Sequence, residues 1–179
     1  KSSSSVGNYR ISEYMGAKTC AECHSEVHAK WTDSHHYHAM EIPSEETVRA
    51  DFNDSVFENY GITTKFFRDD GKYMVETENQ DGEMETFAIA YTFEWEPLQQ
   101  YLVRFPDGRM QVLPTCWDVE KKKWYHLYPD ERIAPDDPLF WTRSMQNWDH
   151  MCADCHSTNL RKVFNPSSQS FATAYSEIN

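Results

Sequence analysis

The decisive stretch of this sequence occurs twice, as Cys20-Ala21-Glu22-Cys23-His24-Ser25 and again as Cys152-Ala153-Asp154-Cys155-His156-Ser157. Each copy has two cysteines separated by two residues and followed at once by a histidine. On a helical turn, positions i, i+3 and i+4 lie on one face. Two thiols can therefore form thioethers with the vinyl groups of a haem while the imidazole reaches its iron. The pattern predicts covalent attachment of haem c.

We call Cys20–His24 the first motif and Cys152–His156 the second motif. The cysteines Cys20 and Cys23 are predicted to attach one haem, and Cys152 and Cys155 a second. The histidines that end the motifs, His24 and His156, are predicted to be the proximal iron ligands. Two covalent haems c are thus the predicted cofactors.

Other interpretations of the cysteines explain less of the sequence. One zinc bound by both pairs would leave both histidines unexplained, and most of the chain separates the pairs. A thioredoxin-like site needs a single motif in a βαβ context. Disulfides within each pair also give the histidines no role. The fifth cysteine, Cys116, is predicted to be a small buried hydrophobe.

Composition is consistent with a haem protein but does not require one. The 179 residues suit one domain, and aromatic residues make up 15% of them. Mean hydropathy is −0.78. Flat apolar cofactors need apolar walls, so many aromatics with a polar average fit a haem protein, and they fit an aromatic-rich β domain equally well.

The charge excludes some partners. A formal net charge of −12 makes the chain a poor binder of nucleic acid or anionic membranes, because phosphates repel it. Basic patches on other redox proteins, or copies of the chain itself, are the expected partners. The acidity could equally serve solubility alone.

The sequence is interpreted as an exported protein, either periplasmic or extracellular. No apolar run approaches the roughly 20 residues that span a bilayer, and no membrane insertion is expected. The sequence opens with the polar stretch Lys1-Ser2-Ser3-Ser4-Ser5 and has no signal peptide, as in a mature chain. Its first residue is not cysteine, so no N-terminal lipid anchor is expected.

The predicted fold class is α+β: an antiparallel β meander flanked by short haem-bearing helices, with much irregular structure. Helices are expected over 18–31 and 146–157, each with one motif. Strand-like stretches over 72–77, 84–91 and 100–105 are rich in β-branched and aromatic residues. Turn signals at Asp70-Gly71, Asp81-Gly82 and Asp107-Gly108 divide the strand region.

The chain is predicted to be a single dihaem domain over 1–179. Within it, 1–60 is the segment of the first haem, 61–128 the meander, and 129–165 the segment of the second haem. Residues 166–179 form a polar tail, expected to be poorly ordered unless a neighbour holds it.

Six histidines remain after the motifs as candidate distal ligands. Three of them lie within four residues, His35, His36 and His38, and at least one is expected to bind iron. His126 lies among aromatics, either as a ligand or as a core histidine. The other two, His28 and His150, have ordinary structural explanations. Methionine ligation by Met40 or Met151 is a weaker alternative.

The chain resembles the N-terminal part of exported multihaem cytochromes c, which are often joined to tetratricopeptide repeats. The resemblance covers nearly the whole sequence and is most specific around the second motif. It implies electron transfer through closely spaced haems in an exported protein. The stretches that carry it are Tyr14–Gly16, Cys20–His24, Trp31, Ser34–His36, Ala39–Met40, Tyr91–Phe93, Pro97–Val103, Pro106–Arg109, Trp117–Asp118, Trp124–Pro129, Gln146–Trp148 and Met151–Leu160.

Two departures from that family bear on ligation. Its members continue beyond a segment like Ser176–Asn179 into a third haem motif, whereas this sequence ends there. They also tend to carry histidine where Phe140 stands. If that histidine serves the third haem, the distal ligands here are one of His35 or His36, plus His126.

The sequence thus predicts an exported dihaem electron carrier, with both haems ligated by two histidines, and not an enzyme. Because the chain ends where its relatives continue and has surplus histidines, it is also a candidate subunit of a polymeric haem wire. The alternative is a haem enzyme with an open axial site that reduces a small nitrogen or oxygen compound.

Overall fold

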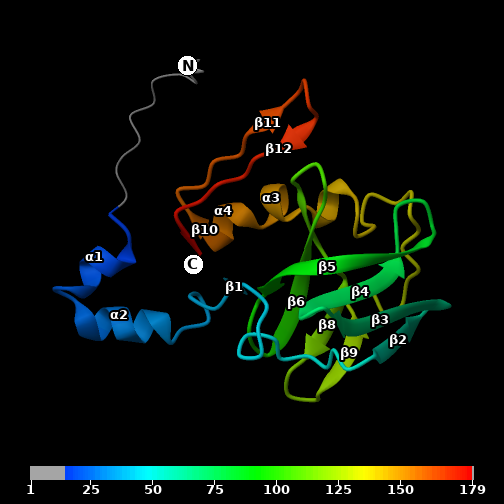
Figure 1. Cartoon of the computed structure of the whole chain (residues 1–179), viewed down its shortest axis with the longest axis horizontal. Coiled ribbons are helices and arrows are strands. Elements are labelled where there is room, and N and C mark those ends of the chain that lie inside the picture. Colours follow the sequence, from blue (N-terminus) through cyan, green and yellow to red (C-terminus); the bar gives the residue numbers. More distant parts are fainter. Residues whose placement is uncertain (1–14, 179) are drawn as a thin grey trace.

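A curled antiparallel sheet forms the centre of the molecule (Figure 1). The computed structural model describes residues 15–178, so the predictions for Lys1–Ser5 and Tyr14 lie outside the described residues. Nine strands form this sheet, in the order β2-β3-β4-β5-β6-β8-β9, with β1 on β5 and β7 on β6. Their bounds are β1 Met40–Glu41, β2 Ser55–Asn59, β3 Ile62–Asp69, β4 Lys72–Glu78, β5 Met84–Phe93, β6 Leu98–Arg104, β7 Met110–Val112, β8 Thr115–Asp118 and β9 Lys123–His126.

The sheet is nearly closed into a barrel. Its two end strands, β2 and β9, approach each other, and the indole Nε1 of Trp124 donates a hydrogen bond to Ser55 Oγ at 2.9 Å. Side chains alternate between buried and exposed along β3 and β4, as a strand with one face on a core requires.

Aromatic rings fill the barrel. Phe66 and Trp124 stack face to face, with centroids 3.6 Å apart and planes at 7°. Phe140, where histidine was expected from the family, is 5% exposed and belongs to this core. The buried members of the core are Phe52, Phe66, Tyr73, Val75, Ile89, Tyr101, Val103, Leu113, Trp117, Trp124, Ile133, Phe140 and Trp141.

The predicted fold class is wrong, because the structure is mostly β and its helices are very short. The two predicted helices are broken into pieces at the motifs. The helices are α1 Ala17–Ala21, α2 Ser25–Thr32, the 3₁₀ turn η1 Ser144–Gln146, α3 Trp148–Met151 and α4 Ala153–His156.

The break between α1 and α2 has a local cause. His24 has φ −125° and ψ 43°, which is not helical, so α1 cannot run into α2. Cys152, between α3 and α4, stays in the right-handed helical region, with φ −117° and ψ −37°. Each motif makes one helical turn and no more. The predicted strands over 72–77, 84–91 and 100–105 are confirmed as parts of β4, β5 and β6.

The C-terminal tail is held by pairing. Strand β10, Ser157–Thr158, pairs with β13, Glu177–Ile178, and β11, Phe164–Asn165, pairs with β12, Ser170–Phe171. The backbone N–H of Phe171 also donates to Asp107 O at 2.7 Å. Gly108 permits this approach, because a Cβ there would lie 2.2 Å from Phe171 O.

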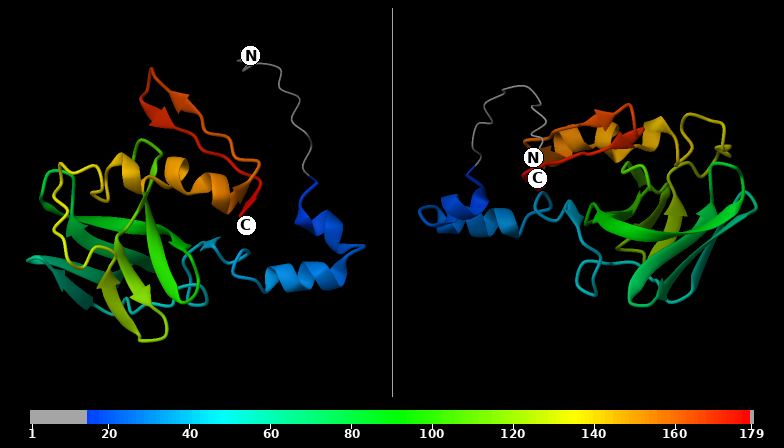
Figure 2. Two further views of the ribbon diagram at one scale, coloured as in Figure 1. Left: turned by 180° about the vertical axis from the view of Figure 1, so that it is seen from behind. Right: turned by 45° about the horizontal axis from the view of Figure 1, so that its top comes forward.

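Helices α1 and α2 form an arm that stands beside the barrel (Figures 1 and 2). No residue of either helix is buried. The arm joins the barrel through the His-rich stretch and β1, and its first backbone N–H, from Ala17, donates to Glu177 Oε1 of the tail at 2.6 Å. Among the described residues, no helix has the length and apolar character to cross a membrane.

Candidate functional site

The two motifs have the same backbone geometry. In the first, the N–H of His24 donates to Cys20 O at 2.9 Å and that of Cys23 to the same oxygen at 3.3 Å. In the second, His156 and Cys155 both donate to Cys152 O at 3.1 Å. A bond from i+4 to i closes a helical turn, so each motif presents its thiols and imidazole on one side.

The first motif lies on the arm and is open to solvent. Cys20, Cys23 and His24 are all exposed. The carbonyl of His24 accepts from the N–H of His28 at 2.9 Å, which starts α2. Apart from this helical bonding, the arm gives the motif little support.

The second motif is built onto the barrel. Trp148 and Ala153 are both 0% exposed and pack with Met110 and Val112 of β7. Asp149 is buried as well, and its Oδ2 accepts from the N–H of Met110 at 2.8 Å. These contacts fix α3 and α4 against the sheet before any cofactor contributes.

The motif cysteines are unpaired. All five cysteines of the chain are free, including Cys116, which is 0% exposed as predicted. Burial raises the pKa of the Cys116 thiol to about 12. Burial, then the charges of Glu94 and Cys155, raise the pKa of Cys152 to about 11, so it stays a neutral thiol near pH 7. Within residues 15–178, no group of three or more His, Cys, Asp or Glu side chains is arranged to hold a metal ion.

The end of β5 lies against the second motif histidine. The ring of Phe93 meets that of His156 edge to face, with centroids 5.1 Å apart. Glu94 Oε1 lies 3.9 Å from His156 Nε2. Glu94 also has φ 65°, a left-handed conformation that is costly for a residue with a Cβ.

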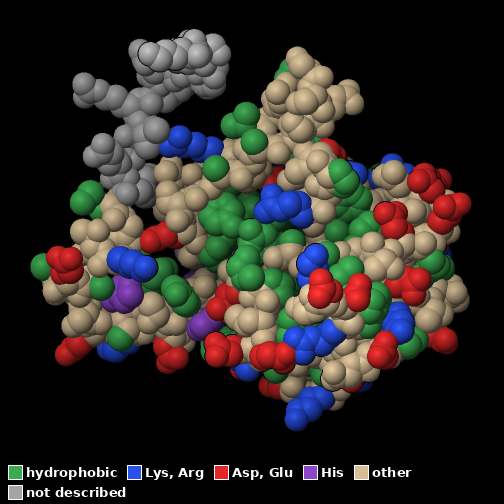
Figure 3. Space-filling model, viewed as in Figure 1, with side chains coloured by type: hydrophobic (Ala, Val, Ile, Leu, Met, Phe, Trp, Pro, Cys, Tyr) green, Lys and Arg blue, Asp and Glu red, His purple; other side chains and the backbone are tan. Residues whose placement is uncertain are grey.

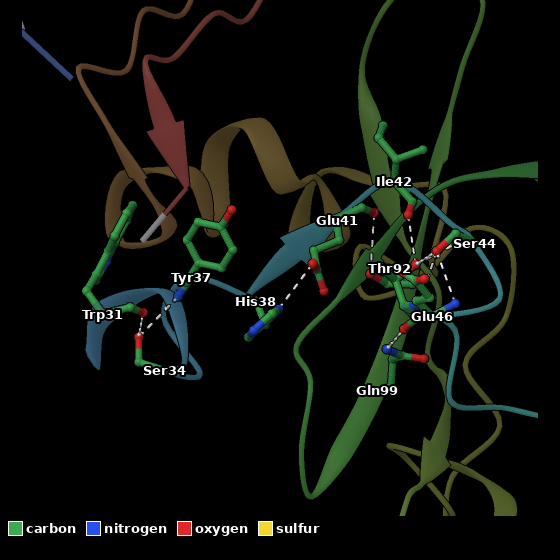
Figure 4. A network of polar contacts seen from close by, with 11 residues as sticks. Trp31, Ser34, Tyr37, His38, Glu41, Ile42, Ser44, Glu46, Thr92 and Gln99 are labelled. Carbon is green, nitrogen blue, oxygen red and sulfur yellow. Dashed lines mark hydrogen bonds and ion pairs between the residues drawn. The ribbon is translucent and has the colours of Figure 1, made fainter. Parts of the chain in front are cut away.

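The His-rich stretch converges on this same segment. Strand β1 pairs with β5, with Met40 opposite Phe93. This pairing brings the histidines that precede β1 next to Trp95. The Trp95 ring contacts His35 and His38, with centroids at 5.5 and 4.2 Å. His38 Nδ1 lies 3.1 Å from Glu41 Oε1 (Figure 4). Thus the chain around Phe93–Trp95 touches both the second motif and the histidines that follow the first.

A cleft of about 320 Å³ lies between the arm, β1 and the tail. Hydrophobic side chains gather on the face of the molecule next to the arm (Figure 3). The cleft is lined by Ala17, Lys18, His28, Trp31, Thr32, Tyr37, Met40, Glu41, Glu177 and Ile178.

His126 lies elsewhere, at the end of β9. Its ring is half-buried, and its Nδ1 accepts from the N–H of Tyr128 at 3.1 Å. Burial lowers the pKa of His126 and the charge of Arg132 lowers it further, against the contact of Nδ1 with the Tyr128 carbonyl oxygen at 3.2 Å, which raises it. It lines a cavity of about 50 Å³ whose walls include no residue of either motif. The structure therefore places His35 against Trp95, whose neighbour Glu94 lies near His156, whereas β9 carries His126 to another part of the molecule (Figures 1 and 2).

Sequence reasoning missed Glu94, Trp95 and Glu177. Glu94 and Trp95 follow a predicted strand, yet only the β1–β5 pairing shows what they meet. Glu177 lies in the tail, where the sequence gives no sign of a partner on the arm.

The donor chemistry fits covalent haem: free thiols in pairs, each pair on one turn with a histidine. Such a donor set is typical of c-type cytochromes. The family model described as cytochrome c554 and c-prime matches residues 19–79, which contain the first motif and the His-rich stretch. This match supports a haem-binding cytochrome that transfers electrons. Comparison with curated proteins and with solved structures gives no match.

Proposed function

We propose that this chain is an exported electron carrier with two covalent haems c. The observation that carries the proposal is the repeated turn: both motifs close the same i+4 to i hydrogen bond, to Cys20 O and to Cys152 O. The family match covers only the first motif, so the second haem rests on this shared geometry.

In this proposal the motif residues hold the cofactor and its iron. Cys20 and Cys23 bind one haem, Cys152 and Cys155 the other, and His24 and His156 are the proximal ligands. Haem iron, when bound, supplies reversible one-electron exchange. The protein fixes the spacing of the haems, excludes water and tunes their potentials.

The proposed distal ligands are one of His35 or His36, plus His126. The position of the His-rich stretch beside Phe93–Trp95 supports a role for His35 or His36 at the second haem. The lowered pKa of His126 favours the neutral imidazole, which is the form that binds metal. Contacts near the second motif support His35 or His36, whereas the support for His126 is its lowered pKa.

A second candidate function is a haem enzyme with an open axial site that reduces a small nitrogen or oxygen compound. Such an enzyme needs an acid–base group at the open face of a haem, whereas Glu94 lies 3.9 Å from His156 Nε2, beside the histidine proposed as the proximal ligand. Six-coordinate haems would leave no place for a substrate.

Partners and location belong to the proposal too. The net charge of −12 supports docking to basic patches on other redox proteins. Assembly of copies into a polymer with aligned haems remains a prediction, which size-exclusion chromatography of native protein tests. A single small species would contradict it.

The central experiment measures mass and absorbance of the native protein. We expect the polypeptide mass plus two haems, and low-spin spectra in the oxidised state. High-spin spectra would favour the enzyme. A mass equal to the bare polypeptide would refute the whole proposal.

Single histidine variants test the distal ligands. His126→Ala should change the spectrum and potential of one haem, and so should either His35→Ala or His36→Ala. His150→Ala, an exposed histidine beside the second motif, is the matched control and should change neither. An unchanged spectrum in His126→Ala would remove that residue from the ligand set.

A further inference from the structure

We infer that the cleft between the arm and the barrel is the seat of the haem attached to the first motif. The inference rests on the proposed function and adds the residues that surround this haem. Three separate parts of the chain form the walls: the arm, β1 and the C-terminal strand β13.

The position of the cleft relative to the motif follows from helix geometry. His28 and Thr32 line the cleft from α2, and they are four residues apart, on one face of that helix. His24 precedes α2 directly, and its carbonyl accepts from the N–H of His28. Helix α1, whose Ala17 and Lys18 also line the cleft, ends within the first motif. The first motif therefore lies between two helices that both border the cleft.

The chemistry of the walls suits a porphyrin. Trp31, Met40 and Ile178 offer apolar surface to a flat ring. Lys18, at the rim, supplies a cation that can pair with a propionate. The volume of about 320 Å³ falls in the range of about 300–1,000 Å³ found for cofactor pockets.

The sparse packing of the arm is a second, independent observation. No residue of α1 or α2 is buried, although Trp31 is large and apolar. Eight-residue helices are marginal without packing partners, so something must cover this surface. A haem in the cleft would pack against both the arm and the barrel and supply the missing contact.

The seat also links the two motifs. Ile178 is paired with Ser157, the residue directly after His156. One wall of the first haem site thus belongs to the strand pair that begins where the second motif ends. The two haems would be near neighbours, with the β10–β13 pair between their sites.

Methyl NMR of the native protein labelled at isoleucine tests the seat. We expect the Ile178 methyl signal to be displaced from the ordinary methyl range by the haem. The displacement should vanish in the Cys20→Ala, Cys23→Ala double variant and persist in the Cys152→Ala, Cys155→Ala double variant. Ile89, which is buried in the barrel core and lines neither cavity, is the internal control. An ordinary Ile178 signal, or one that depends on the second motif, would overturn the inference.

Redox titration gives a second test that needs no cysteine variant. Ile178→Asp places a negative charge in the cleft and should lower the potential of one haem, because it stabilises the ferric state. Val163→Asp, at an apolar tail position that is 52% exposed and outside the cleft, should leave both potentials unchanged. Equal potentials in Ile178→Asp and the unaltered protein would count against the seat. A protein without covalent haem would instead contradict the proposed function.

Discussion

The two motifs make the same turn on very different supports. The first lies on an arm without a buried residue, whereas the second comes after Trp148 and includes Ala153, both 0% exposed. The hydrogen bonds within the two turns are nevertheless alike. The turn is therefore a local property of the five-residue motif, and the surrounding fold decides only how firmly it is held.

This difference suggests different roles for the two haems in the fold. The second motif is positioned by protein contacts alone. The first, in our inference, depends on the haem that fills the cleft between arm and barrel. Substitutions on the two supports test this contrast, and the largest effect is expected beneath the second motif.

Trp148→Ala should destabilise the protein by about 3–5 kcal/mol, because it leaves a cavity under the second motif. Val27→Ala on the arm, at a side chain that is 66% exposed, should change the stability by no more than about 0.5 kcal/mol. Denaturant unfolding measures both. Similar values for the two variants would show that the arm is packed as firmly as the second motif.

Asp149→Ala should cost about 1–3 kcal/mol, since the buried N–H of Met110 loses its acceptor. Asp154→Ala is the matched control, because Asp154 is a 67% exposed carboxylate that pairs with Lys162 at the surface. Its loss should cost at most about 1 kcal/mol. Unfolding curves that rank the two in the opposite order would contradict the account of how α3 is anchored.

Loss of the first haem should free the arm. In the Cys20→Ala, Cys23→Ala double variant we expect trypsin to cut after Lys30 at least about tenfold faster, which corresponds to about 1.4 kcal/mol of lost docking free energy. The Cys152→Ala, Cys155→Ala variant should leave this cleavage rate close to that of the unaltered protein. Equal rates in all three proteins would mean that the arm docks without its haem.

Glu177→Ala should have the smallest effect, confined to the arm. Removing the acceptor of the Ala17 N–H should cost about 1 kcal/mol and speed exchange of that amide about fivefold. Glu177→Gln keeps an oxygen in place and is the matched control. If both variants exchange alike and faster than the parent, charge rather than the hydrogen bond holds the arm.

Local signals in the sequence were reliable. The cysteine spacing predicted both turns, and β-branched and aromatic stretches predicted the central strands. The predicted helices were too long because a motif that needs one turn was extended into neighbouring residues, whereas His24 leaves helical geometry. A pattern that specifies one turn does not determine the conformation of the residues after it.

Pairings between distant parts of the chain could not be predicted from the sequence. Nothing near Met40 or Glu41 indicates that they pair with Phe93 and Thr92, about fifty residues later. The same holds for the tail, whose polar composition suggested poor order although it pairs with itself and with the arm. The candidate site could be predicted as two motifs, but not as an arrangement that joins them through Phe93–Trp95.

Because β1 pairs with β5, the distance between the two motifs does not depend on the length of the chain that connects them. Only the pairs Met40–Phe93 and Glu41–Thr92 define this pairing, with Glu94 N donating to Ala39 O at 2.8 Å. Residues inserted into the turns at Gly71 or Gly82 would lengthen the chain without moving either attachment point. A slip of one residue at β1 would turn the His-rich stretch to the opposite face. Engineered versions could therefore carry tags or extra loops at those turns and keep the geometry of the redox centres.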